Sequence, residues 1–154
     1  MKYVKPGMTI SEIKSSLVGY SFDKDFLSNY GIDSELEGTL IKHQHDNLLF
    51  VWTKYNSGKV FEVIVLNPKV YVDGNIRVGS TLNDFTSKYS DYRMELDAVN
   101  ESTEYAYSKK CFYVIEFISN NTPVSEYNAD FSLNKVVNSH AIIDRIRITM
   151  ANKN

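Results

Sequence analysis

Apolar side chains recur at helical spacing in two places along the chain, and a Gly-x-Thr triplet precedes each of them. A threonine hydroxyl there can accept a hydrogen bond from the first helical turn, and a carboxylate three residues later can complete a capping box. We therefore predict one helix that begins after Thr9 and another that runs from about Thr81 to Ser90. The apolar positions are Ile10, Ile13 and Leu17 in the first and Leu82, Phe85 and Tyr89 in the second.

These helix starts belong to a longer match between Val4–Ile13 and Ile76–Phe85. The glycine and the threonine are identical in both segments, and most other positions keep their chemical type. The capping carboxylates are Glu12 and Asp84. Self-similarity at about half the chain length predicts a tandem duplication, with repeat 1 over about residues 1–72 and repeat 2 over about residues 73–154.

Strand-like runs follow the first helix. The polar stretch Ser21–Asp33 is expected to hold a short second helix around Asp23–Asn29. Turn chemistry at Asp46-Asn47 and at Asn56-Ser57-Gly58 then separates three runs that read as an antiparallel meander. The predicted strands are Leu36–His43, Leu48–Lys54 and Val60–Asn67.

The second repeat is predicted to hold strands at Arg93–Val99, Glu104–Tyr107, Cys111–Ile118 and Ile142–Thr149. Alternation along the last of these predicts one apolar face. We expect its other face, with Ile143, Arg145, Arg147 and Thr149, to be solvated or to meet a partner.

The segment Ser119–His140 has no counterpart of equal length in the first repeat. We expect a loop there, in which Phe131–Val137 forms a partial strand or a helical turn. Long loops in small domains are often functional.

Together these elements predict an α+β fold in a single domain of 154 residues. Each repeat is expected to be a helix-led antiparallel sheet. The sheets are continuous or abutting, with the helices packed on one face.

Charge and composition exclude some partners. The net charge is −2, and the four arginines do not cluster, so we expect no nucleic-acid binding. Aromatic residues make up 13% of the chain, including eleven tyrosines, a content that suits strands and protein interfaces equally. Cys111 stands alone, and its apolar setting predicts a buried strand position rather than a reactive thiol.

Candidate chemistry is sparse. His43 and His45 have the spacing that places two side chains on one face of a strand, but zinc needs three or four protein ligands. His140 lies elsewhere, and the chain has no nucleophile elbow, phosphate loop or His-Glu-x-x-His motif. We therefore expect no catalytic residues, no metal and no cofactor.

No apolar run is long enough to span a bilayer, and the first residues lack the apolar core of a signal peptide. We expect no transmembrane segment. A periplasmic or envelope location, with an export signal already removed, is favoured slightly over the cytoplasm.

The segments Gly-Met-Thr-Ile-Ser-Glu-Ile and Gly-Ser-Thr-Leu-Asn-Asp-Phe resemble the Gly-Met-Thr helix starts of the β-lactamase-inhibitor-protein-like group and of the SmpA/OmlA-type small lipoproteins. The tandem inhibitor is similar in layout, although this chain lacks its cysteine pairs and has Ser80 where Met is usual. The resemblance implies a binding role without catalysis, often in the bacterial envelope.

The function expected from the sequence is therefore non-catalytic binding of another protein, such as a toxin or an enzyme, by an inhibitor or immunity protein. The alternatives are an envelope assembly lipoprotein domain and an enzyme of unrecognised type. Interfaces depend on a few aromatic and arginine anchors. The predicted anchors are Trp52, Tyr55, Tyr105, Tyr107, Tyr127 and Arg145.

Overall fold

The computed structural model describes residues 4–100, 102–118 and 122–150. These residues form two compact units. The first unit holds residues 4–70 together with residues 147–150, and the second unit holds residues 71–146. The chain therefore passes from the first unit to the second close to the predicted repeat boundary and returns to the first unit in its last strand.

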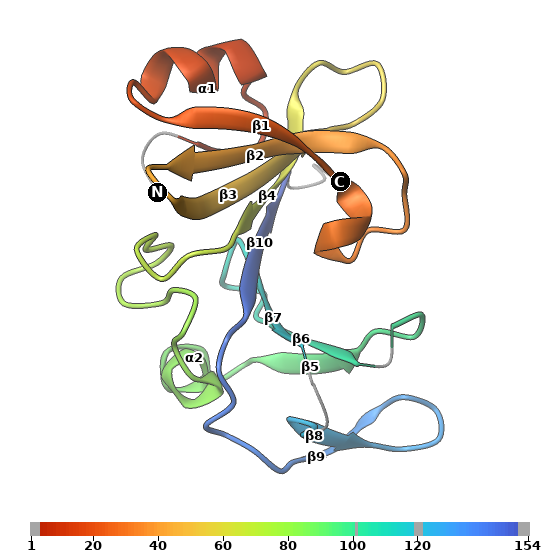
Figure 1. Ribbon diagram of the computed structural model, residues 1–154. Coiled ribbons are helices and arrows are strands. Elements are labelled where there is room, and N and C mark those ends of the chain that lie inside the picture. The colour runs from red at the N-terminus through yellow and green to blue at the C-terminus, as the bar shows by residue number, and fades with distance from the viewer. Residues whose placement is uncertain (1–3, 101, 119–121, 151–154) are drawn as a thin grey trace. The chain divides into compact units, whose positions relative to one another are not determined.

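The first unit is led by a short helix (Figure 1). Its strands are neighbours in the order β1-β2-β3-β4, each antiparallel to the next, and residues 147–149 of the last strand lie beside β4. Its elements are α1 (Ile10–Ser16), β1 (Ser21–Phe26), the 3-10 segment η1 (Leu27–Tyr30), β2 (Glu37–His43), β3 (Asp46–Thr53) and β4 (Val60–Val65).

The second unit repeats this plan and adds a hairpin (Figure 1). Strands β5, β6 and β7 are antiparallel neighbours, and residues 145–146 of β10 lie beside β7. Its elements are α2 (Leu82–Lys88), β5 (Arg93–Leu96), β6 (Thr103–Tyr107), β7 (Val114–Ile118), β8 (Ser125–Tyr127) and β9 (Leu133–Val136), followed by β10 (Arg145–Thr149). The predicted α+β class with antiparallel sheets is confirmed.

Both helices begin with the predicted capping box. Thr9 Oγ1 accepts from the backbone N–H of Glu12 at 3.2 Å, and the backbone N–H of Thr9 donates to the Glu12 carboxylate at 2.7 Å. Thr81 and Asp84 make the same two bonds at 3.1 and 2.7 Å. The preceding glycines adopt φ of 91° and 88°, a left-handed conformation in which a side chain would be strained.

Matched backbone bonds identify the equivalent strands of the two copies. The N–H of Gly7 donates to the carbonyl of Val60 at 2.8 Å, and the N–H of Gly79 donates to the carbonyl of Ile143 at 2.9 Å. The segment that enters β10 is therefore the counterpart of the start of β4. The β8–β9 hairpin therefore lies between the third and fourth strands of the second unit, where the first unit has only a short turn.

In the first unit, η1 covers one face of the sheet. Its Leu27 and Tyr30 pack against Leu40, Phe50 and Ile64, and the Tyr30 ring stacks on Phe50 with centroids 3.8 Å apart. Residues of β3 are also buried on the opposite face, which explains why both its odd and its even positions are apolar.

The region before β2 was predicted wrongly. Asp23–Asn29 is not a helix, because Ser21–Phe26 pairs with β2 as a strand and only the four residues of η1 turn. β1 is an edge strand in which Lys24 stands between Phe22 and Phe26, so the sequence shows no apolar alternation there. The turn after β2 was also misplaced, because Gln44 takes φ 56° and Asp46 already belongs to β3.

Three further predictions for the second half need correction. Cys111 lies in the turn before β7 and is only partly buried, with its thiol donating to the Tyr113 carbonyl at 2.9 Å. Ile143 is fully buried rather than solvated, because it pairs with the glycine turn before α2. Arg147 is also enclosed, with only 11% of its side chain exposed.

Candidate functional site

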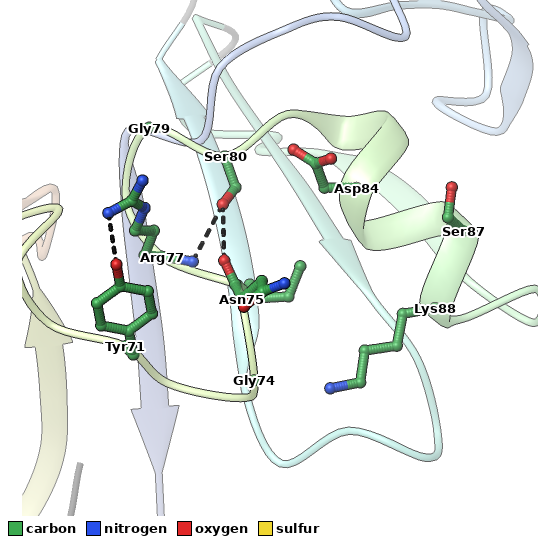
Figure 2. Close-up of a pocket in the computed structure, with 10 residues that line it drawn as sticks. Tyr71, Gly74, Asn75, Arg77, Gly79, Ser80, Asp84, Ser87 and Lys88 are labelled. Atoms are coloured by element: carbon green, nitrogen blue, oxygen red, sulfur yellow. Dashed lines mark hydrogen bonds between the residues drawn. The ribbon is translucent and has the colours of Figure 1, made fainter.

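A hollow in the second unit has a volume of about 880 Å³. It lies between the turn that enters the second copy and the outer side of α2 (Figure 2). Two cationic side chains lie on opposite sides of it, Arg77 from the turn and Lys88 from the last helical position. The other lining residues are Tyr71, Gly74, Asn75, Ile76, Gly79, Ser80, Asp84 and Ser87.

Hydrogen bonds fix the turn that forms one wall of this hollow. The N–H of Ile76 donates to the carbonyl of Asp73 at 3.1 Å, closing a tight turn in which Gly74 takes φ 62°. Ser80 Oγ accepts from the N–H of Arg77 at 3.3 Å and donates to the carbonyl of Asn75 at 3.2 Å. A methionine, the residue at the matching position 8 of the first unit, could make neither bond.

The carboxylate of Asp73 ties this turn to the rest of the second unit. It pairs with Lys88 Nζ at 2.7 Å and accepts hydrogen bonds from the hydroxyls of Tyr89 and Tyr113. The bonds from Lys88 and Tyr89 lower the pKa of Asp73, so its charge is kept well into acid. Burial, followed by the Asp73 contact, raises the pKa of Tyr89. These groups hold the turn in place.

The second candidate surface is the inserted hairpin, which a buried carboxylate fixes to the sheet. Glu104 of β6 is 2% exposed. It accepts from the N–H of Val124 at 2.6 Å and from the hydroxyl of Tyr127 at 2.9 Å. Burial, followed by the bond to Glu104, raises the pKa of Tyr127.

The hairpin and the residue directly after it expose apolar side chains. Phe131, Leu133 and Val137 are 48%, 37% and 45% exposed, within a stretch of seven residues. Phe131 also takes φ 63°, an uncommon conformation for an aromatic residue, in the turn between β8 and β9. None of these three residues is among the anchors predicted from the sequence.

The six predicted anchors divide between the two units. Trp52 is half-buried, and its indole N–H donates to Glu62 at 2.8 Å, so it takes part in the packing of the first unit. Tyr55 lies in the turn after β3 and is 82% exposed. Because these two belong to the first unit and the other four to the second, each unit presents its own set.

In the second unit, Tyr105 and Tyr107 are half-buried on the same face of β6. Their hydroxyls donate to Asp97 at 2.9 Å and to Glu95. Tyr127 is half-buried beneath the hairpin through its bond to Glu104. Arg145 begins β10 and is half-buried. The structure therefore brings Tyr105 and Tyr107 together on β6. Tyr127 belongs to the hairpin and helps to fix it to the sheet through its bond to Glu104.

His43 and His45 lie at the end of a hairpin and do not share a strand face. β2 ends at His43, whose ring lies 4.8 Å from that of Tyr20, and His45 follows in the turn. Within residues 4–100, 102–118 and 122–150, no group of three or more His, Cys, Asp or Glu side chains could hold a metal ion. In the same residues, no helix is long and apolar enough to cross a membrane.

Comparison with known proteins identifies a similar fold. No protein-family profile and no curated protein sequence matches the chain. Among solved structures, the chain is similar to the uncharacterized protein yfeY from Escherichia coli, with a TM-score of 0.57 and 8% sequence identity. The match covers 94% of this chain and 90% of that one. At this identity the likeness concerns the fold alone, so the chain shares its α+β architecture with yfeY.

Proposed function

We propose that this chain is a non-catalytic protein-binding module, of the inhibitor or immunity-protein kind, that docks through the β8–β9 hairpin. The observation that carries the proposal is the exposure of Phe131 and Leu133 in a hairpin that has no counterpart in the first unit, and of Val137 directly after it. Burying exposed apolar area contributes about 25 cal/mol per Å², so a cluster of such side chains favours a partner that covers it.

Two further features support this proposal. Glu104 holds the base of the hairpin, so little ordering is required when a partner binds, and preorganised surfaces lose less free energy on association. The tip is also fixed, because the N–H of Asn128 donates to the carbonyl of Ser132 at 2.9 Å. A rigid, apolar projection is what an inhibitor needs in order to fill a cleft on its target.

Affinity capture with a matched pair of variants tests the proposal. The bait is the wild-type chain, and the comparison bait carries Phe131→Ser, Leu133→Ser and Val137→Ser together. The control bait carries Val18→Ser and Val99→Ser, because these exposed residues lie outside the hairpin. We expect one protein from the native host to be recovered by the wild-type and control baits and to fall at least about tenfold with the hairpin variant. Equal recovery by all three baits would rule out the hairpin as the binding surface.

A further inference from the structure

The loop at the tip of the β8–β9 hairpin places an aromatic residue where hairpins usually carry glycine. The N–H of Phe131 donates to the carbonyl of Asn128 at 2.9 Å, and the N–H of Asn128 donates to the carbonyl of Ser132 at 2.9 Å. These two bonds close a three-residue loop over residues 129–131, and the last position of such a loop takes the left-handed conformation. Phe131 occupies that position with φ 63°. A side chain there crowds its own backbone, which is why glycine is the usual residue.

The Phe131 ring adds no aromatic contact to the fold that would explain this conformation. The side chain is 48% exposed. Within the described residues, the ring contacts neither another aromatic ring nor a cationic group. In the same residues, the other non-glycine positions with positive φ hold Gln44 and Asn56, which are both polar, and asparagine tolerates this conformation well. A bulky apolar side chain kept on the surface in a disfavoured backbone conformation therefore points to a function.

A negative charge accompanies the ring at the tip. Asp130 Oδ1 accepts from the hydroxyl and from the N–H of Ser132, at 2.6 and 3.0 Å. These two bonds lower the pKa of Asp130, so its carboxylate is charged at neutral pH. Among the residues that the structure describes, no cationic side chain pairs with Asp130, whereas Glu126 of the same hairpin pairs with Lys135 at 3.2 Å. The tip therefore combines an exposed phenyl ring with an unbalanced negative charge.

We propose that Phe131 is the central anchor of the hairpin, and that the partner covers it with an apolar pocket for one phenyl ring and a cationic side chain beside Asp130. This inference rests on the proposed function and narrows it to a partner of this chemistry. Interfaces depend on a few aromatic anchors in pockets, surrounded by contacts that exclude water. Leu133 and Val137 take that surrounding role. The cation at the rim of the pocket orients the two proteins as they approach.

Thermal melting tests the strain at position 131 without any partner. Phe131→Gly should melt about 2–4 °C above Phe131→Ala, because only alanine keeps the crowded β-carbon. Lys135→Gly and Lys135→Ala are the control pair within the extended strand β9, and there the glycine variant should melt below the alanine variant. A Phe131→Gly protein that melts at or below Phe131→Ala would overturn the argument from strain.

Affinity capture from the native host tests the anchor itself. The baits are the wild type, Phe131→Gly, and a double variant with Leu133→Ser and Val137→Ser. Recovery of the protein that the wild-type bait captures should fall at least about tenfold with Phe131→Gly and at most about threefold with the double variant. Asp130→Asn keeps an oxygen that can accept from Ser132. Its capture should fall less than that of the wild type between about 0.05 M and about 0.5 M sodium chloride.

The outcomes separate this inference from the proposed function. Full capture by Phe131→Gly, together with loss of capture by the bait that replaces all three apolar residues by serine, would overturn the anchor and leave binding through the hairpin intact. Full capture by that triple variant, or no captured protein at all, would contradict both proposals. A salt dependence that is unchanged in Asp130→Asn would overturn the cationic rim.

Discussion

Replacement of Arg147 by Met tests how the last strand is held in the first unit. The side chains of Arg147 and Glu62 are 11% and 7% exposed, and their charged atoms are 3.1 Å apart. Arg147 also donates to the carbonyl of Tyr30, and Glu62 accepts from the Trp52 indole. Arg147→Met would leave the Glu62 carboxylate buried without its Arg147 partner, at a cost of about 3–5 kcal/mol.

The size of that loss can be dissected with two further variants. Arg147→Lys keeps the charge but cannot fork between Glu62 and Tyr30, so we expect a loss of about 1–2 kcal/mol. Adding Glu62→Gln to Arg147→Met removes the stranded charge, and the double variant should recover at least about half of the loss.

Urea denaturation followed by Trp52 fluorescence measures these differences in the first unit, because the chain has one tryptophan. Arg93→Met is the control, since Arg93 is exposed on β5. An Arg147→Met protein within about 1 kcal/mol of wild type would refute the reasoning. So would a double variant that lost the sum of the two single effects.

Three other predictions follow from the second unit. Thr81→Ala should lower the free energy of unfolding by about 0.5–2 kcal/mol, whereas Ser87→Ala, within the same helix, should change it little; chemical denaturation measures both. Asp73→Asn should destabilise the protein at neutral pH. The folded-state pKa of Asp73 is lowered, so its contribution to the free energy of unfolding is fully present above the usual aspartate pKa of about 4. That contribution is lost as the pH falls through the lowered pKa. The denaturation curves of variant and wild type should therefore converge in acid. Glu104→Ala should speed hydrogen exchange of the β8–β9 amides and leave β2 and β3 unchanged; unchanged exchange in the hairpin would show that Glu104 does not fix it.

Local chemistry explains which elements could be predicted from the sequence. The capping boxes at Thr9 and Thr81 depend on residues within one helical turn, so the sequence pattern was enough to place both helices. β1 could not be identified in this way, because an edge strand needs apolar residues on one face only, and its pairing with β2 is not local. The burial of Arg147 depends on Glu62, which is far away in the sequence, so no local pattern could indicate it.

The candidate surfaces also divide into features that a local sequence pattern indicates and features that depend on contacts in the folded chain. The unequal length of the two repeats drew attention to the segment that holds β8 and β9. Its exposed residues could not be identified, because Phe131 and Leu133 look like ordinary strand residues in the sequence. The sequence did contain a sign of the hollow, the replacement of Met by Ser80, but its significance depends on the contact with Asn75 that only the structure provides.

Site-specific photo-crosslinking in the native host tests the central claim, binding through the hairpin, most directly. A photoreactive phenylalanine analogue is placed at position 131, and at positions 18 and 99 for comparison, which are 89% and 88% exposed outside the hairpin. The account predicts a discrete covalent adduct with one other protein from position 131 and none from positions 18 and 99. No adduct from position 131, or the same adducts from all three positions, would contradict it.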